Sequence, residues 1–383
     1  MYTTFQTPGR IIHGEGCIES LASEVERLGC GRVLIVTDPG IVECGAHRLA
    51  EATLAKAGIP YALCADVESD PSPACVERCA KAFKDFSPDV IVGLGGGSSM
   101  DVAKAVALVA AHGTPAQRFF GIELVPSPCP PTILVPTTAG TASETTSITV
   151  LLDPETQSKK GIVSSHLFAK TVILDPLLTL SLPPFWTATT GIDALVHAIE
   201  SYVNLGATPI TEGMCLQAMR LIVPNIRKAY ANGGNREARA AMLYGASLAG
   251  MGFSNTQNGI IHAIGHAVLA SHHLPHGLLM AAASPMGMAF NALAAPEKFA
   301  TIAGILGVDC SRGNVNDLAR QASEAMKRLL MDLDIAPGLA AHGVLPEEIP
   351  GIAERAVADA RLMARNPRRA TVGEVEALLH RHF

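Results

Sequence analysis

The residues with the clearest chemistry are an aspartate and several histidines in the second half of the chain. Asp193 and His197 are four residues apart in TTGIDALVHAIESY, and His262 and His266 have the same spacing in NGIIHAIGHAVLASHHLPHG. Residues four apart lie on one face of an α-helix, so each pair presents its side chains together. His276 follows in a Pro-His-Gly turn. We predict that these residues form a cage for a divalent first-row metal ion.

The predicted cage consists of one carboxylate and three imidazoles. A single histidine on an apolar helix is more often a core residue, but two helical pairs and a turn histidine are hard to explain by packing. The spacing does not decide which of His262 and His266 is the ligand. We expect His272 and His273 to lie in a solvated turn. Three nitrogens and one oxygen suit Fe²⁺ or Zn²⁺ and do not distinguish between them.

A run of small residues in the first half predicts a phosphate-binding loop. It follows an apolar strand and opens a helix, and its candidate cofactor-binding residues are Gly95, Gly96, Gly97, Ser98, Ser99 and Asp101. Glycines let the backbone approach a pyrophosphate, and the helix N-terminus offers unpaired N–H groups and a positive dipole end. A merely tight strand–helix turn is the alternative. A nucleoside triphosphatase is disfavoured, because no Gly-Lys-Ser/Thr follows.

Two further strand ends carry candidate cofactor contacts. Asp38 closes RVLIVTD, where an acid can bond a ribose 2′-hydroxyl and repel a 2′-phosphate, which favours NAD over NADP. The alternative is a turn-initiating aspartate before Pro39. Thr137, Thr138 and Thr141, in PTTAGTASE, suit contact with phosphates or nicotinamide, although a helix N-cap would also explain them.

The elements that must position these residues follow two different patterns. Strand-like segments at 32–38, 60–66, 89–97 and 131–138 alternate with helical segments at 43–57, 73–86 and 101–113. This alternation predicts a parallel sheet with right-handed crossovers. After 173–184 only helical periodicity continues, and Pro183 and Pro184 mark the boundary. We predict an α/β domain with a parallel Rossmann-like sheet over 1–184 and an all-α domain over 185–383.

Composition excludes several classes of protein. A length of 383 residues favours two domains, and 48% hydrophobic with 17% charged residues fits a compact enzyme. The net charge of −6, without a block of Lys or Arg, argues against nucleic acid or an anionic membrane as the partner. The longest apolar stretch, near 278–290, is too short to span a bilayer.

The nine cysteines are scattered and form no C-x-x-C pair, which favours a reducing cytoplasm over a disulfide framework. The N-terminal residues lack a basic segment followed by an apolar one, so no secretory signal is expected.

Several motifs occur together, in order: GGGSSMDVAKA, PTTAGTASE, TGIDALVHAIESY, HAIGH followed by PHG, and Asn366-Pro367-Arg368. With them the chain resembles the iron-containing (group III) alcohol dehydrogenase family, which has a dehydroquinate synthase-like fold. The resemblance covers essentially the whole chain. It implies the metal ligands Asp193, His197, His262 and His276. It also implies that His266 is a non-ligand histidine near the substrate, and that Lys160 contacts the cofactor.

The resemblance implies an NAD-dependent alcohol dehydrogenase or aldehyde reductase with bound Fe²⁺, or alternatively Zn²⁺. The metal would act as a Lewis acid on a small alcohol or aldehyde, hydride would pass between that substrate and nicotinamide, and His266 would relay a proton. It also implies a homodimer or higher homo-oligomer in which the N-terminal strands, FQTPGRIIHG here, pair between subunits.

Alternatives stay open at this point. The same fold could support a glycerol dehydrogenase-like enzyme, a dehydroquinate synthase-like lyase, or a reductase of a specialised oxo-acid, sulfonate or phosphonate aldehyde. A non-catalytic metal- or nucleotide-binding protein is disfavoured because the motifs are complete. Departures from the family pattern at His166, Ala169, Leu269 and the His272-His273 pair leave the substrate open.

Overall fold

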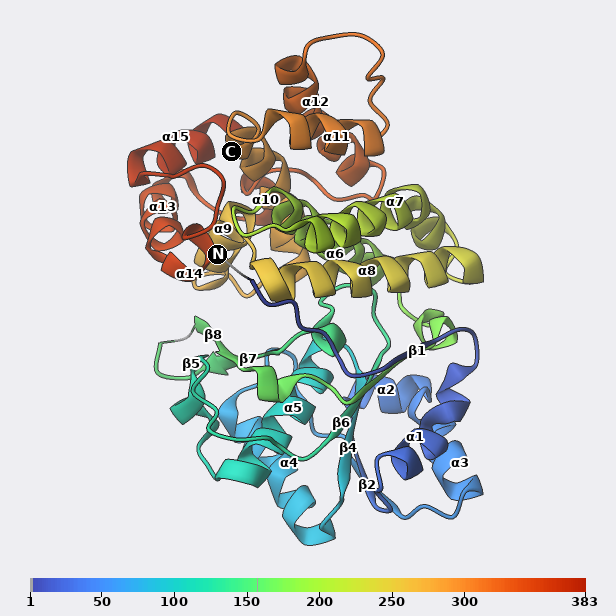
Figure 1. Cartoon of the computed structure of the whole chain (residues 1–383). Coiled ribbons are helices and arrows are strands. Elements are labelled where there is room, and N and C mark those ends of the chain that lie inside the picture. Colours follow the sequence, from blue (N-terminus) through green and yellow to red (C-terminus); the bar gives the residue numbers. More distant parts are fainter. Residues whose placement is uncertain (1–2, 157) are drawn as a thin grey trace. The chain divides into compact units, whose positions relative to one another are not determined.

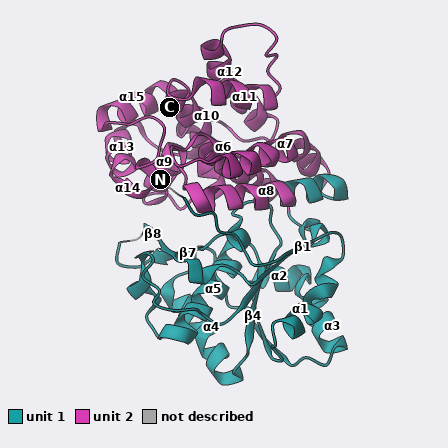
Figure 2. Ribbon diagram, in the orientation of Figure 1, with its two compact units in different colours: residues 1–182, 233–243 teal, residues 183–232, 244–383 magenta. Residues whose placement is uncertain are grey.

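The computed structural model describes residues 3–156 and 158–383, which form two compact units (Figure 1, Figure 2). The first unit comprises the chain up to Leu182 together with Gly233–Leu243. The second comprises Pro183–Asn232 and Tyr244–Phe383. The returning segment Gly233–Leu243 includes the start of a long helix, so the predicted boundary at 184/185 does not describe the first unit fully.

The first unit is built on a six-stranded sheet in which every pairing is parallel. In spatial order its strands are β1 (Ile11–His13), β9 (Thr171–Leu174), β6 (Thr132–Pro136), β4 (Val90–Gly95), β2 (Val33–Val36) and β3 (Tyr61–Cys64). The central strands β2, β4 and β6 are buried along their whole length, as expected for apolar runs in a sheet covered on both faces. The predicted parallel sheet is confirmed.

Helices follow the strands in the predicted alternation. They are α1 (Leu21–Arg27), α2 (Pro39–Cys44), α3 (His47–Lys56), α4 (Pro73–Phe86) and α5 (Gly97–His112). Segment 43–57 was predicted as one helix and is instead divided between α2 and α3. Gly45 causes the break, because its φ of 77° places it in the left-handed region that ends a helix.

A second, three-stranded sheet was not predicted from the sequence. Its order is β5 (Gly121–Ile122), β8 (Ser158–Val163) and β7 (Ile148–Asp153). Strands β7 and β8 are antiparallel, with Leu151 opposite Lys160, whereas β5 and β8 are parallel. Strands β7 and β8 follow the PTTAGTASE segment, and β7 contacts α5.

The second unit contains only helices and turns within the described residues, which confirms the predicted helical C-terminal part. Its helices are α6 (Pro184–Val203), α7 (Pro209–Ala231), most of α8 (Arg236–Thr256), α9 (Ile260–Leu269), α10 (His276–Asn291), α11 (Pro296–Ile305), α12 (Val315–Met331), α13 (Ile349–Ala358), α14 (Ala360–Met363) and α15 (Val372–His382). The helix predicted to begin at 255 begins at Ile260, because Gln257 has a φ of 85° and interrupts the periodic segment.

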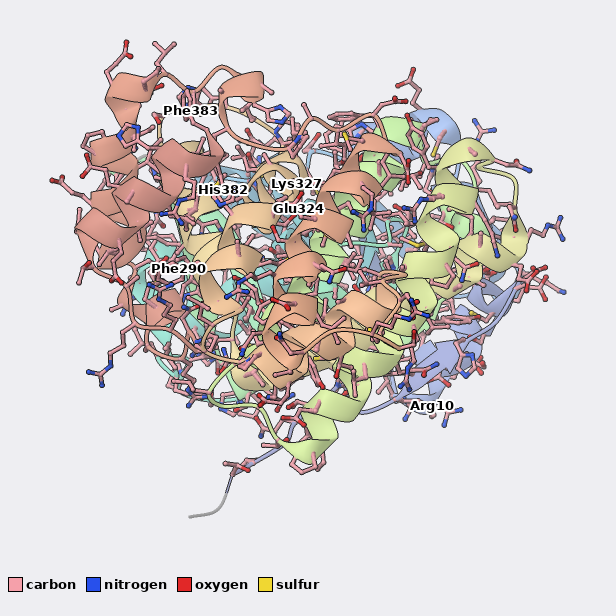
Figure 3. All side chains as sticks on the ribbon, turned by 90° about the horizontal axis from the view of Figure 1, so that it is seen from above. Arg10, Phe290, Glu324, Lys327, His382 and Phe383 are labelled. Carbon is pink, nitrogen blue, oxygen red and sulfur yellow. The ribbon has the colours of Figure 1, made fainter. Side chains whose placement is uncertain are left out.

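The C-terminal segments of the second unit pack against helices that come earlier in the same unit. His382, near the end of α15, lies close to Lys327 and Glu324 of α12 (Figure 3). Arg368, between α14 and α15, places its guanidinium 4.0 Å from the centroid of the Phe290 ring of α10. In the part of the chain described here, no helix combines the length and the apolar character needed to cross a bilayer.

Candidate metal centre and cofactor site

Helix α6 brings Asp193 and His197 to one buried face. The helix is 20 residues long and begins with Pro184, which is suited to a first helical turn. Both side chains are almost completely buried, and His197 Nε2 lies 3.8 Å from Asp193 Oδ1. The predicted pairing by helical spacing is therefore present.

Helices α9 and α10 supply two more imidazoles to the same aspartate. His262 Nε2 lies 3.8 Å and His276 Nε2 lies 3.6 Å from Asp193 Oδ1. The ligand atoms of these three residues all lie within 4.8 Å of one another. Four tetrahedral ligands about 2.1 Å from a metal would be about 3.4 Å apart, so the side chains are close to the spacing that a bound cation requires.

His197 adjoins this group of three residues and contacts it through its ring. Its imidazole stacks on that of His262 with a centroid separation of 4.8 Å, and on the Phe253 ring at 4.4 Å. The rings of Phe253 and His262 thus both pack nearly parallel to the His197 ring.

Burial and charge keep His262 neutral, which is the form that binds metal. Burial lowers the pKa of His262 well below its ordinary value, and the imidazoles of His197, His276 and His266 lower it further, as does Arg361. Its Nε2 is buried and makes no hydrogen bond to any described residue. A buried ring nitrogen facing a carboxylate and two other imidazoles fits a divalent metal ion.

Glu200 is a site residue that the sequence analysis missed. Its Oε2 accepts a 2.6 Å hydrogen bond from His262 Nδ1, so the other ring nitrogen is the one turned to Asp193. Burial raises the pKa of Glu200 to about 7. The signal was available, because Asp193, His197 and Glu200 have the spacing i, i+4, i+7 and so share one helical face.

His266, predicted as the proton-relaying histidine, belongs to the same cluster of rings. Its centroid lies 5.3 Å from that of His276 and 6.0 Å from that of His262, and the residue is partly exposed. The two predicted turn histidines have other surroundings. His272 hydrogen-bonds Ser271, and its Nε2 lies 3.5 Å from Glu348 Oε2, whereas His273 is exposed.

The predicted phosphate loop joins β4 to α5 in the first unit. Gly95 has a φ of 147°, and a Cβ there would lie 2.6 Å from Ser99 Oγ. A Cβ on Gly97 would lie 2.8 Å from Thr141 Cγ2, whereas one on Gly96 would meet nothing closer than 3.6 Å. No described side chain caps the N-terminus of α5. Its N–H groups and dipole are therefore available to an anion, as the phosphate prediction requires.

Asp38 lies beside this loop and also caps the N-terminus of α2, the helix that follows it. Its Oδ1 accepts the Ile41 N–H at 3.1 Å as the N-cap of α2, and its Oδ2 accepts a 2.8 Å hydrogen bond from Ser99 Oγ. The helix-initiating role that competed with ribose binding is thus present. Ribose binding by the partly exposed carboxylate stays a prediction.

The three threonines of PTTAGTASE surround the same loop. Thr137 is buried and donates its backbone N–H to the Gly95 carbonyl at 2.9 Å. Thr138 would be in ordinary contact with a Cβ on Gly96, and Thr141 packs on Gly97. Thr138 and Thr141 are partly exposed, so they border the loop surface on which a phosphate would lie.

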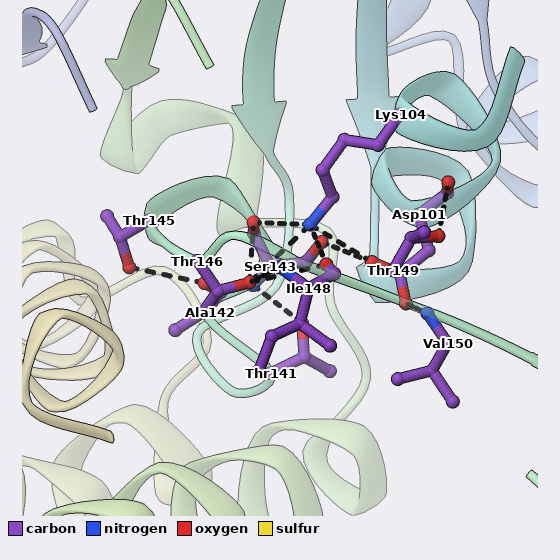
Figure 4. Close-up of polar contacts among 10 residues, drawn as sticks. All are labelled: Asp101, Lys104, Thr141, Ala142, Ser143, Thr145, Thr146, Ile148, Thr149 and Val150. Atoms are coloured by element: carbon purple, nitrogen blue, oxygen red, sulfur yellow. Dashed lines mark hydrogen bonds and ion pairs between the residues drawn. The ribbon is translucent and has the colours of Figure 1, made fainter. Parts of the chain in front are cut away.

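Asp101 was predicted to bind the cofactor, but its carboxylate is already engaged in a network with Lys104 (Figure 4). Ser143 Oγ donates to Oδ1 at 2.5 Å, and the Val150 N–H donates to Oδ2 at 3.0 Å. Lys104 Nζ lies 3.3 Å from Oδ1 and donates to the carbonyls of Ser143 and Ile148. These contacts hold the PTTAGTASE loop and β7 to α5, which is a structural role.

Lys104 was not singled out from the sequence, yet its side chain is only 1% exposed. Burial lowers the pKa of Lys104 below its ordinary value, and the Asp101 carboxylate opposes that shift. Lys160, the predicted cofactor lysine, is on β8, where its Nζ pairs with Asp153 Oδ2 at 2.5 Å.

Comparison with known proteins covers both units. A model described as iron-containing alcohol dehydrogenase matches residues 8–176, and one described as the C-terminal part of the Fe-containing alcohol dehydrogenase family matches residues 187–383. The chain belongs to the iron-containing alcohol dehydrogenase family. It is therefore an oxidoreductase, and the residues that carried the family resemblance lie in the two matched regions.

Individual relatives within this family are similar over nearly the whole chain. A sulfoacetaldehyde reductase of Bilophila wadsworthia is 48% identical over 379 residues, covering 98% of each chain. An NAD-dependent methanol dehydrogenase of Bacillus methanolicus is 36% identical, covering 98% of this chain and 99% of the other. The crystal structure of a 1,3-propanediol oxidoreductase superposes with a TM-score of 0.97 at 36% identity, and each chain is covered completely.

Proposed function

We propose that this member of the iron-containing alcohol dehydrogenase family reduces a small aldehyde that carries a sulfonate group, with NADH as the reductant. The reaction would convert sulfoacetaldehyde, NADH and a proton into 2-hydroxyethanesulfonate and NAD⁺. The observation that carries the substrate is the 48% identity to a sulfoacetaldehyde reductase over 98% of both chains. The relative that acts on methanol is only 36% identical.

The metal ligands in this proposal are Asp193, His197, His262 and His276. When bound, Fe²⁺ or Zn²⁺ would supply Lewis acidity toward the aldehyde oxygen, and NADH would supply the hydride. Asp193 supports this assignment, because its Oδ1 is within 3.6 to 3.8 Å of a ring nitrogen from each of the three histidines. The carboxylate also offsets part of the positive charge of a divalent ion.

His266 would hold the proton that the product oxygen receives. Its ring lies 5.3 Å from that of His276, which places it next to the ligand cluster. An imidazole titrates near neutral pH and can both hold and release a proton during turnover.

Arg361 is the residue that we propose attracts the sulfonate. It is exposed on α14, a short helix that contacts α9, and its charge acts on the His262 imidazole. A cation whose charge acts on the metal centre would favour a substrate with an anionic tail over a neutral one of equal size.

The NAD site in this proposal is the loop from Gly95 to Ser99, bordered by Thr138 and Thr141, with Asp38 as the ribose contact. The uncapped N-terminus of α5 and the absence of side chains on three successive glycines support pyrophosphate binding there. The NAD-dependent relative supports the choice of nicotinamide cofactor.

We further propose that the protein works in the cytoplasm as a homodimer or higher homo-oligomer. All nine cysteines are free thiols, in keeping with a reducing compartment. Strand β1 pairs with β9 and ends the sheet order, so no strand among the described residues pairs with its other edge, which could accept a partner strand. Light scattering that finds only monomer would contradict the oligomer.

The decisive experiment compares aldehydes on iron-loaded and zinc-loaded protein by following NADH oxidation. We expect kcat/KM for sulfoacetaldehyde to exceed that for propanal and 3-hydroxypropanal by more than about tenfold, the discrimination that about 1.4 kcal/mol gives. Faster turnover of 3-hydroxypropanal would instead indicate a diol dehydrogenase. Arg361→Leu should raise KM for sulfoacetaldehyde and leave KM for propanal unchanged. Arg312→Leu, an exposed arginine on a loop, is the control.

A further inference from the structure

The N-terminus of α9, the helix that carries His262 and His266, is held by two side chains from distant segments. Asn366 Oδ1 accepts the Ile260 N–H at 3.1 Å, and Glu200 Oε1 accepts the Ile261 N–H at 2.6 Å. Asn366 and Glu200 are both 2% exposed. The first N–H groups of a helix have no partner within it, so these two bonds replace an ordinary N-cap side chain, which Gly259 cannot provide.

Gly259 is what allows both side chains to reach the helix. A Cβ at this position would lie 2.7 Å from Asn366 Oδ1 and 3.1 Å from Glu200 Oε1. Any larger residue would displace at least one of them. The glycine therefore serves close approach rather than an unusual backbone angle, since its φ is −148°.

Glu200 uses its second oxygen on the imidazole of the same helix. Oε1 holds the Ile261 backbone while Oε2 accepts the His262 Nδ1–H at 2.6 Å. One carboxylate thus fixes both the start of α9 and the orientation of a ring two residues from that start. Because Glu200 is on α6 with Asp193 and His197, it also sets the distance between the ligands of α6 and the ligand of α9.

Asn366 ties the same point to α10. Its side-chain amide exchanges two hydrogen bonds with Asn291 at the end of that helix, at 2.9 and 2.8 Å. Arg368 supports this contact by donating to the Phe290 carbonyl at 3.2 Å and by covering the Phe290 ring. Asn366 therefore holds helices together through hydrogen bonds to Ile260, Asn291 and Arg368 rather than to an imidazole.

We propose that Glu200 is a positioning residue that determines how tightly the centre retains its metal ion. It does so by holding His262 with Nδ1 protonated and Nε2 directed to the ion. This inference rests on the metal centre of the proposed function, but not on the identity of the substrate. Partners that orient a ligand histidine typically change metal affinity by about 10- to 100-fold when they are removed.

The geometry also predicts why a neutral amide is a poor substitute. Both hydrogen bonds to Glu200 are accepted by its carboxylate. A glutamine has one acceptor oxygen, so its NH₂ group would face either the Ile261 N–H or the His262 Nδ1–H. Glu200→Gln should therefore lose one of the two contacts while keeping the volume of the side chain.

The test measures Co²⁺ binding by chelator competition and the visible absorption of the Co²⁺-loaded protein. Glu200→Gln should bind Co²⁺ about 10- to 100-fold more weakly than wild type, with an altered spectrum. Asn366→Ala removes the other cap, so it should lower the melting temperature while changing Co²⁺ affinity less than about threefold, because it leaves the ligand orientation intact. Glu324→Gln, on the exposed surface of α12, should match wild type in both measurements.

Two results would overturn the inference. One would contradict only the role of Glu200, and the other would contradict the metal centre as well. Wild-type affinity and spectrum in Glu200→Gln would show that Glu200 does not position the ligand, and the metal centre itself would stand. Failure of wild-type protein to bind Co²⁺ would remove the metal centre and the proposed function together. If Glu200→Gln does not fold, Glu200→Asp keeps the charge but shortens the reach, and unchanged affinity in that variant would equally contradict the inference.

Discussion

The two units present their candidate ligand sites in opposite ways. In the first unit the site is mostly backbone: three successive glycines lead into a helix whose N-terminus no described side chain caps. In the second unit it is mostly side chain: an aspartate and three histidines from three helices converge, and most of their surface is buried. The first site would bind a diffuse phosphate charge, and the second a point charge.

The contrast predicts which changes each site tolerates. A backbone site is damaged when atoms are added, because Gly95 and Gly97 have neighbours within 3 Å of a hypothetical Cβ. A side-chain site is damaged when one charged or metal-binding side chain is removed. The remaining side chains then stay buried without the metal ion that they would share. The following four predictions test that contrast.

The largest effect should come from Asp193→Asn in the second unit. The variant keeps the shape of the side chain but removes the charge that faces all three imidazoles. Loss of Lewis acidity is worth several kcal/mol, so we expect kcat/KM to fall about 10³-fold. Metal content measured by mass spectrometry should fall in parallel. The control is Asp332→Asn, which alters an exposed ion pair with Arg227 and should leave kcat/KM and metal content unchanged. Near-wild-type metal content in Asp193→Asn would contradict the predicted metal site.

A smaller effect is expected from Lys104→Met in the first unit. The lysine is completely buried, so its removal leaves the Asp101 carboxylate without its paired cation and the carbonyls of Ser143 and Ile148 without this donor. Removing one partner of a buried pair typically costs about 3 kcal/mol, which urea unfolding can measure. The double variant with Asp101→Asn should lose less than the sum of the two single variants. Additive losses would show that the two residues do not act as a pair.

Adjacent glycines offer a sharper comparison. Gly97→Ala should destabilise the protein by about 1–3 kcal/mol, because its Cβ would overlap Thr141. Gly96→Ala has only ordinary contacts, so its melting temperature should match wild type. If a phosphate binds at this loop, Gly96→Ala should still raise KM for NADH. Unchanged KM together with unchanged stability would mean that the loop is only a tight turn.

The smallest effect should be on cofactor choice. Asp38→Asn retains an oxygen that can accept the Ile41 N–H but removes the charge. Two unit charges about 4 Å apart interact by about 1 kcal/mol in water, so the ratio of kcat/KM for NADPH to that for NADH should rise about fivefold. An unchanged ratio would leave Asp38 as a helix cap alone.

Sequence reasoning succeeded where the signal was local. The i, i+4 spacing placed Asp193 with His197, and the apolar runs before Asp38 and Gly95 predicted buried parallel strands. It could not choose between His262 and His266, because both lie on the same face of α9. In the structure, Nε2 of His262 lies 3.8 Å from Asp193 Oδ1, and the ring of His266 lies 6.0 Å from that of His262 and 5.3 Å from that of His276. The choice of His262 as the ligand stays a prediction.

The features that sequence reasoning missed involve contacts between residues far apart in the chain. The Asp101 carboxylate accepts hydrogen bonds from Ser143 and Val150, a structural role that its position in the sequence did not indicate, and its contact with a cofactor stays a prediction. Lys104 gave no signal, because a lysine in an apolar helix is ordinarily a surface residue. The hairpin of β7 and β8 was missed, since the charged segment that begins at Ser158 does not have the apolar character of the central strands.

The close approach at Gly259 has an evolutionary consequence. A substitution there is compatible with the fold only if the Glu200 and Asn366 side chains move or shorten, so the three positions should vary together among homologues rather than one at a time. Covariation among positions 200, 259 and 366 would thus record a constraint shared by residues up to 166 positions apart in the chain. Homologues that keep Glu200 and Asn366 while accepting large residues at position 259 would show that the helix start can be rebuilt without the glycine.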